Sequence, residues 1–236
     1  MKKAVYYILP VIASMTLFSC ITSLNPLVTY RNIISQDAAI GKWTGAGQTF
    51  ILEKALGSEI DKYYGQSADE KKKTPEQRMN QMPAAERKVF QNGYITNFFA
   101  NGVRYYMVLS FTSINGELYA QLETLESFRM KENENLATPG TSDQSSSAVF
   151  GSSKGGYTFA KVVIHKDVMQ FSFIDPRFVE HQIQSGTAAL RNEQDPLFGN
   201  IAITASTEEL QKFITKYGKD SRLYTKESTL VLTRQH

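Results

Sequence analysis

The sequence predicts an α+β fold that is rich in β-structure, with an antiparallel sheet and two or three helices. Several segments of the chain alternate apolar and polar residues, which is the pattern of strands with one buried face. Tight-turn signals such as Asn115-Gly116 separate neighbouring segments and favour antiparallel pairing. One segment near the C-terminus has instead the spacing of an amphipathic helix.

The N-terminal residues have the features of a secretory signal peptide. Met1-Lys2-Lys3 is positively charged, and the fifteen residues from Ala4 to Phe18 carry no charge. That run is short for a membrane-spanning helix, and Pro10 within it would weaken such a helix. We therefore expect residues 1–19 to be a signal peptide that ends immediately before Cys20.

Cys20, the only cysteine of the chain, follows Leu17-Phe18-Ser19, and these four residues resemble the bacterial lipobox. The resemblance implies that a diacylglyceryl group is first attached to the Cys20 thiol as a thioether. Cleavage then frees the Cys20 amine, and a fatty acid such as palmitate acylates this amine. A thiol suits this role because its thiolate is nucleophilic. The alternative is a buried free cysteine at the end of a core helix. A single cysteine excludes an intramolecular disulfide and a thiolate metal cluster.

The mature chain is expected to be one β-rich domain on a short lead. Residues 20–37 are interpreted as the lipidated cysteine and a tether, and residues 38–236 as a single domain. Two polar excursions interrupt that domain, near residues 64–88 and 131–156. The first is charged and contains proline, which predicts a surface segment with some helix. The second is rich in serine and glycine, which predicts a mobile loop.

The strands of the first half are predicted from turn residues and alternation. The first element covers Ile40 to Lys54, with a turn or bulge at Gly45 and Gly47 and a strand from Thr49 to Glu53. A hairpin is predicted near residues 102–125, because apolar residues alternate on both sides of the Asn115-Gly116 turn.

The second half of the chain alternates strands with helices. The segments "YTFAKVVIH" and "VMQFSFI" are predicted strands joined at Lys166-Asp167. Asp175-Pro176 then supplies the N-cap and the first-turn proline of a helix that reaches Gly186. Ser206 and Glu209 form a capping box before a helix that Gly218 ends. The last predicted strand is Thr229 to Arg234.

Three residues resemble the closure of lipocalin-like β-barrels. Gly41 and Trp43 stand at the start of the first strand, and Arg234 stands near the end of the last one. In lipocalin-like barrels a tryptophan closes the barrel floor and an arginine of the final strand stacks on its indole. A planar guanidinium gains cation–π and stacking energy in that arrangement. The resemblance implies that the sheet is a lipocalin-like, partly closed barrel.

The overall layout is similar to that of uncharacterised envelope lipoproteins of Bacteroidetes-type bacteria. The resemblance lies in the lipobox, in "PLVTY" from Pro26, in "IGKW" from Ile40, and in "ITASTEELQKFITKY" from Ile203 before a final "L-x-L-x-R" strand. This group has no established activity, so the resemblance implies fold and location only. Because no acidic residue follows Cys20 directly, we expect an outer-membrane lipoprotein that faces the periplasm.

The sequence predicts no catalytic residues, no metal ligands and no cofactor. His165, His181 and His236 have no metal-binding spacing. His165 and His181 could form an acid–base cluster with a serine. Glu117, Glu123 and Glu126 alternate along one hairpin arm in a way that could place paired carboxylates. Surface positions are the simpler interpretation for both sets. The chain contains no nucleophile elbow, no H-E-x-x-H and no P-loop.

The aromatic residues of the strands leave two interpretations open. The side chains of Tyr105, Met107, Phe111, Met169, Phe171 and Phe173 could line a cavity for an apolar ligand or could fill the core. We favour the filled core.

Three functions follow as hypotheses. The first is a lipid-anchored binding or assembly module that meets an envelope protein partner. The second is a lipocalin-like carrier of a small apolar ligand, and the third is an envelope hydrolase that uses His165 or His181. Nucleic acid is not an expected partner, because loss of residues 1–19 lowers the formal charge from +3 to +1.

Overall fold

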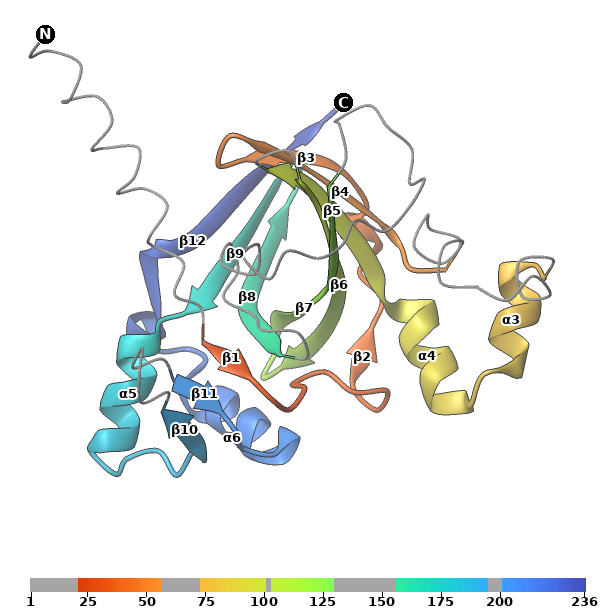
Figure 1. The fold of residues 1–236 in the computed structure, drawn as a ribbon. Helices are drawn as coiled ribbons and strands as arrows, with labels where there is room; N and C mark the ends of the chain where they lie inside the picture. Colours follow the sequence, from red (N-terminus) through yellow and green to blue (C-terminus); the bar gives the residue numbers. More distant parts are fainter. Residues whose placement is uncertain (1–20, 57–72, 101–102, 130–155, 195–200) are drawn as a thin grey trace, which may run out of the picture.

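The computed structural model describes residues 21–56, 73–100, 103–129, 156–194 and 201–236. Eight strands close into an antiparallel barrel (Figure 1), which confirms the predicted β-rich α+β class and its lipocalin-like form. The barrel strands follow one another in the order β3 (Gly41–Gly45), β4 (Gln48–Lys54), β5 (Tyr94–Ala100), β6 (Val103–Ile114), β7 (Glu117–Arg129), β8 (Tyr157–His165), β9 (Val168–Ile174) and β12 (Tyr224–Gln235). Closure follows because β12 pairs with both β9 and β3.

Tight turns join consecutive barrel strands where the sequence predicts them. Asn115 and Gly116 connect β6 to β7 with φ values of 52° and 78°, the positive values that a two-residue hairpin of this type requires. β8 and β9 turn at Lys166, whose φ is 50°. β3 and β4 turn at residues 46–47. The predicted hairpin near residues 102–125 is therefore confirmed.

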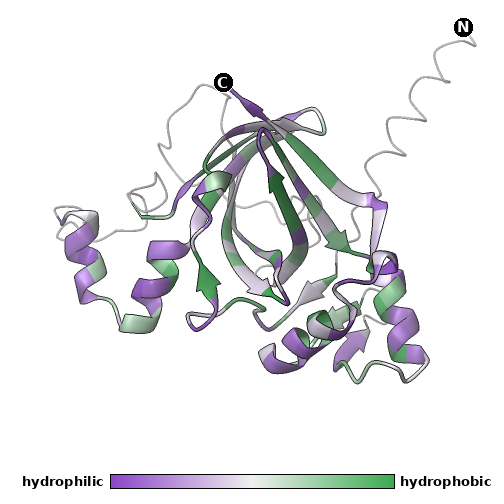
Figure 2. Ribbon diagram, turned by 180° about the vertical axis from the view of Figure 1, so that it is seen from behind, coloured by the Kyte–Doolittle hydropathy of each residue, from purple (hydrophilic) through white to green (hydrophobic). Residues whose placement is uncertain are grey.

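The barrel interior is a continuous apolar core. Met169, Phe171 and Phe173 of β9 are 0%, 4% and 1% exposed, because alternate residues of a strand point to the same side of the sheet. Aromatic rings stack within this core, as do Phe98 and Tyr105 with centroids 5.0 Å apart. Figure 2 shows hydrophobic residues concentrated along the barrel strands.

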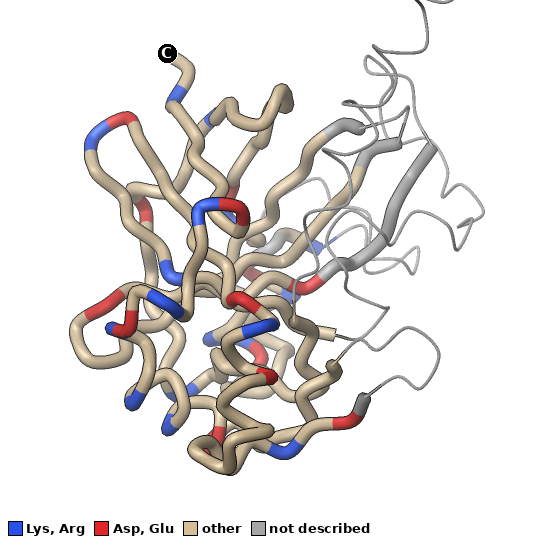
Figure 3. The backbone as a smooth tube through the Cα atoms, turned by 90° about the vertical axis from the view of Figure 1, so that its left-hand side faces the viewer, with Lys and Arg blue, Asp and Glu red and all other residues tan. Residues whose placement is uncertain are grey.

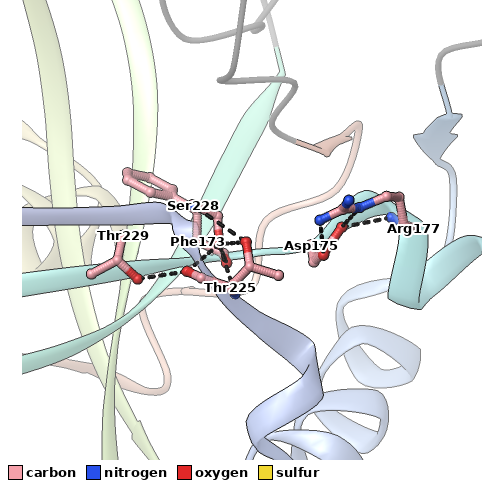
Figure 4. Close-up of polar contacts among 6 residues, drawn as sticks. All are labelled: Phe173, Asp175, Arg177, Thr225, Ser228 and Thr229. Carbon is pink, nitrogen blue, oxygen red and sulfur yellow. Dashed lines mark hydrogen bonds and ion pairs between the residues drawn. The ribbon is translucent and has the colours of Figure 1, made fainter. Parts of the chain in front are cut away.

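One corner of the molecule joins β9, a helix and a bulge of β12 (Figure 4). This β9–α5 corner consists of residues 173–177 and of the β12 bulge, residues 225–228. The register of β12 against β9 shifts within the bulge. Ser228 Oγ donates a hydrogen bond of 3.0 Å to the carbonyl oxygen of Phe173 and thereby holds the bulge against β9.

The helix α5 (Pro176–Gln184) starts at this corner as the sequence predicts. Asp175 is its N-cap and accepts a 2.9 Å hydrogen bond from the backbone N–H of Arg177. The guanidinium of Arg177 also pairs with the Asp175 carboxylate at 2.9 Å. The Asp175 cap pairs with a backbone N–H of the first turn, and Pro176 has no N–H that needs a partner. Local residues alone therefore specify the start of the helix.

A second layer covers the outer wall of β7 and β8. It contains α5, α6 (Thr207–Tyr217), the 3₁₀ turn η5 (Ser221–Leu223) and the short strands β1 (Thr22–Ser23), β10 (Asn192–Gln194) and β11 (Ile201–Ile203). α6 begins with the predicted capping box: the Glu209 N–H donates to Ser206 Oγ and the Ser206 N–H donates to the Glu209 carboxylate. A second hydrophobic cluster lies between this layer and the barrel; its buried members are Ile21, Leu27, Tyr119, Phe159, Ile174, Val179, Leu190, Ile203, Ala205, Leu210, Phe213, Ile214 and Leu223.

The buried Tyr119 and the half-buried Tyr224 fix the end of α6 to the barrel wall. The hydroxyls of Tyr119 and Tyr224 donate hydrogen bonds of 3.3 and 3.2 Å to the carbonyl oxygen of Gly218. Burial raises the pKa of both phenols above the ordinary value. A side chain at Gly218 would collide with the Tyr119 hydroxyl, so this close approach requires glycine.

The opposite side of the barrel carries α3 (Pro75–Gln81), α4 (Ala84–Asn92) and the strand β2 (Ile33–Ile34), which pairs with β6. The two helices lie within the polar excursion predicted near residues 64–88 and confirm its helical content. Residues 57–72 of that region lie outside the described residues. The loop predicted over residues 131–156 also lies outside them, apart from Gly156.

The predicted tether is the main difference between expectation and structure. Residues 20–37 were expected to lead loosely to the domain, but Ile21, Leu27 and Ile33 are 5%, 0% and 5% exposed. The same range contains β1, β2 and the start of the 3₁₀ turn η2 (Asp37–Ala39). The segment is held because its apolar residues complete the second layer and cover β6.

Candidate functional site

The three residues proposed for barrel closure lie together at one end of the barrel. The indole of Trp43 is fully buried, and its Nε1 donates to the carbonyl of Ala39 at 2.9 Å. The guanidinium carbon of Arg234 lies 4.2 Å from the Trp43 ring centroid. Its two terminal nitrogens donate to the carbonyl oxygens of Ile40 and Ala38 at 2.7 and 2.6 Å. The arginine therefore ties β12 to the segment that enters β3.

Gly41 makes room for this arginine. Its φ is 140°, and a Cβ placed there would lie 2.6 Å from Nη1 of Arg234. A side chain at position 41 would thus be strained and would displace the guanidinium. The group formed by Gly41, Trp43 and Arg234 is structural, because its polar atoms are directed at backbone carbonyls.

A second polar group fastens η2 to the barrel, and no pattern in the sequence predicts it. Lys54 Nζ lies 2.6 Å from the Asp37 carboxylate and donates to the hydroxyl of Tyr94 at 2.9 Å. Tyr94 is fully buried, and Lys54 also lies over its ring at 4.4 Å. The Lys54 ammonium holds the pKa of Asp37 below its ordinary value. Because the partners are 17 and 40 residues from Lys54 in sequence, only the fold brings them together.

A small cavity of about 20 Å³ lies inside the barrel among the described residues. Its wall is apolar except for Thr96, and it includes Leu109, Phe171 and Phe173. The buried Thr96 Oγ1 has no hydrogen-bond partner among the described residues. A space of this size holds about one water molecule. Among the described residues the interior is therefore a filled core, as the sequence analysis favoured.

A larger groove lies on the second layer, between α6 and the segment that follows α5. Its volume is about 210 Å³. The lining residues are Thr187, Ala188, Ala189, Leu190, Glu209, Lys212, Phe213, Lys216 and Tyr217. The floor is apolar, since Leu190 and Phe213 belong to the second hydrophobic cluster. The rim carries the ammonium groups of Lys212 and Lys216.

Hydrogen bonds fix the two sides of this groove. Lys216 Nζ and the Tyr217 hydroxyl donate to the carbonyl oxygen of Thr187 at 3.0 and 2.9 Å. On the other side Arg191 pairs with Glu209 at 2.8 Å. Arg191 and the Ser206 cap together lower the pKa of Glu209 to about 2. At neutral pH the Glu209 carboxylate is thus ionised and paired with Arg191, whereas Lys212 is an exposed cation on the rim.

The histidines do not form a cluster. His165 ends β8 next to the β8–β9 turn, whereas His181 is exposed on α5 beyond the other end of β9. The seven residues of β9 lie between them, a span of about 23 Å. His236 lies 3.3 Å from Asp167 at the end of β12. None of the three lines the interior cavity or the groove.

The glutamates of the hairpin arm also lie in different surroundings. Glu117 pairs with Lys161 at 3.0 Å. Glu123 is half-buried, and burial raises its pKa. The side chain of Glu126 and the whole of Cys20 lie outside the described residues.

The described residues contain no group of three or more His, Cys, Asp or Glu side chains suited to hold a metal ion. They also contain no helix with the length and apolar content needed to cross a membrane. Comparison of the chain with protein-family models, curated proteins and solved structures finds no match.

The groove is the feature that sequence reasoning missed. Lys212 and Lys216 are one turn apart on the polar side of α6, a spacing that is ordinary for a solvated helix face. Its other wall comes from residues 187–190, and no pattern in that stretch predicts where it packs. The groove therefore had no recognisable signal in the sequence.

Proposed function

We propose that the protein is a lipid-anchored module of the bacterial envelope that binds a small ligand in the groove beside α6. The observation that carries the binding role is the contrast between a groove of about 210 Å³ and an interior cavity of about 20 Å³. The lipobox-like "LFSC" sequence before Ile21 supports the anchor at Cys20. The absence of an acidic residue after Cys20 supports an outer-membrane location facing the periplasm.

The groove suits a small amphiphile with an apolar body and an anionic end. Ala188, Leu190 and Phe213 offer an apolar floor, and Lys212 and Lys216 stand at the rim. Glu209 does not oppose an anion strongly, because Arg191 already neutralises it at 2.8 Å. The groove is smaller than the sites of most drug-sized ligands, so a short acyl carboxylate or one anionic side chain of a protein partner fits its size.

The two other functions have less support. A lipocalin-like carrier would hold its ligand inside the barrel, where the described side chains leave space for about one water molecule. A hydrolase built on His165 and His181 would need both in one site, but β9 separates them.

The anchor is tested by metabolic labelling with an acyl-chain analogue in the native type of host. The wild-type chain should incorporate the label and sediment with membranes, whereas Cys20→Ser should do neither, because serine cannot form the thioether. Leu24→Ala, at an exposed position four residues away, is the control and should behave as the wild type. Equal labelling of wild type and Cys20→Ser would refute the anchor.

The groove is tested with two probes of equal length and opposite charge, hexanoate and hexylammonium. Hexanoate should shift the NMR signals of Leu190 and Phe213 in a saturable manner, and hexylammonium should not. Ala189→Trp should block the groove and abolish the shifts, whereas Ala84→Trp on α4 should leave them unchanged. Lys212→Gln should weaken hexanoate binding several-fold. Equal responses to both probes, or binding that survives Ala189→Trp, would contradict the proposed site.

A further inference from the structure

The residue directly after Cys20 is already packed in the folded body. Ile21 is 5% exposed and packs within the second hydrophobic cluster. Thr22 pairs with Ala202 of β11, and Ser23 pairs with both Ile203 and Tyr157. One residue of extended chain spans at most about 3.6 Å. A group attached at position 20 is therefore held close to the body, without a flexible spacer.

The strand pairing determines where the chain before Ile21 leaves the body. β1 and β9 both run antiparallel to β8, and both pair with the edge of β8 that β7 does not use. In these two registers Ile21 and Ile174 both fall opposite Phe159. The two strands thus meet end to end, so the chain before Ile21 has to leave the sheet where β9 ends. That place is the β9–α5 corner.

The exposed surface of this corner is polar and electrically balanced. The side chain of Arg177 in the corner and that of Arg222 in the adjacent η5 are 75% and 77% exposed, and each pairs with an aspartate two residues before it. Lys226 and Glu227 are exposed in the β12 bulge. Figure 3 views this side of the molecule and shows positive and negative residues interspersed. Such a surface suits the headgroup layer of a bilayer without a requirement for anionic lipid.

We infer that the β9–α5 corner is the membrane-facing surface of the protein, held against the headgroup layer by the acyl chains on Cys20. This inference rests on the lipidation of Cys20 proposed above. α3 and α4 lie on the opposite side of the barrel (Figure 1). In the proposed orientation they are therefore the elements farthest from the bilayer. α5 starts at the corner, and residues 187–190, which form one wall of the groove, follow its C-terminal end.

The test uses the full lipidated chain in vesicles of zwitterionic phospholipid. Lipidation consumes the only native thiol, so an engineered cysteine is a unique labelling site. Lys226→Cys in the bulge and Gln91→Cys on α4, both at exposed positions, receive an environment-sensitive fluorophore. A nitroxide lipid headgroup should quench the label at position 226 several-fold more than the label at position 91. Replacement of part of the lipid by an anionic one should not change that ratio.

A tether provides the matched control. A long Gly/Ser linker inserted between Cys20 and Ile21 should keep the protein on the vesicles and remove the difference between the two labels. Equal quenching at positions 226 and 91 in the vesicle-bound parent would overturn the orientation and leave the anchor intact. Labelling of the chain that has no engineered cysteine would show a free Cys20 thiol and would overturn both proposals.

Discussion

Trp43→Ala is expected to lower the free energy of unfolding by about 3–5 kcal/mol. The indole is fully buried in the barrel core. Its removal leaves a cavity and also takes away the surface on which the Arg234 guanidinium lies at 4.2 Å. The effect should appear as a lower midpoint of urea unfolding. Far-UV circular dichroism is the suitable probe, because Trp43 is the only tryptophan and fluorescence is lost with it.

A double-mutant cycle separates packing from stacking. Arg234→Met keeps most of the apolar stem and removes the charge and the two hydrogen bonds to Ala38 and Ile40. The coupling energy between Trp43→Ala and Arg234→Met should be about 1–2 kcal/mol, the range of a partly desolvated cation–π contact. A cost below about 1 kcal/mol for Trp43→Ala would contradict its role in closing the barrel.

Phe171→Ala is expected to cost about 3–5 kcal/mol and to give the protein a new ability to bind benzene inside the barrel. Phe171 is 4% exposed and lines the small interior cavity, so its truncation enlarges an apolar space. Benzene should then raise the midpoint of thermal unfolding of the variant by mass action and leave that of the wild type unchanged.

The control for this prediction lies on the outer face of the neighbouring strand. Val163 of β8 is 51% exposed, so Val163→Ala should change stability by less than about 1 kcal/mol and should confer no benzene binding. Stabilisation of the wild type by benzene would show that its interior admits ligands, and the carrier function would then regain support.

The elements that sequence reasoning identified correctly are those that local chemistry specifies. The Asn115-Gly116 turn, the Asp175-Pro176 helix start and the Ser206 capping box all act within four residues of themselves. Each supplies hydrogen bonds or backbone angles that its neighbours need. Such signals can be recognised in the sequence without knowledge of the rest of the chain.

The elements that it missed are stabilised by distant partners. β1, β2 and β10 have two or three residues each, too few for a period to be recognised. β1 forms because Thr22 meets Ala202, 180 residues away in sequence. Residues 21–37, interpreted from the sequence as a tether, pack against the body for this reason. The sequence pattern of such a short segment is the same whether or not a distant partner is present.

The sites divide in the same way. The sequence drew attention to Gly41, Trp43 and Arg234, and the structure places them in contact. It gave no indication of the Lys54–Asp37–Tyr94 group or of the groove beside α6. Both depend on backbone segments that tertiary packing brings together.

The sequence by itself determined the β-rich class, the main hairpins and the two capped helices, because alternation and end-capping residues act at short range. It also singled out Cys20, whose lipidation stays a prediction. Only the tertiary structure decided that the sheet closes, that the described interior is filled, and that Ile21 is packed in the body. These outcomes depend on how side chains from strands far apart in sequence pack together. Their packing is determined only once the folded chain brings those strands into contact.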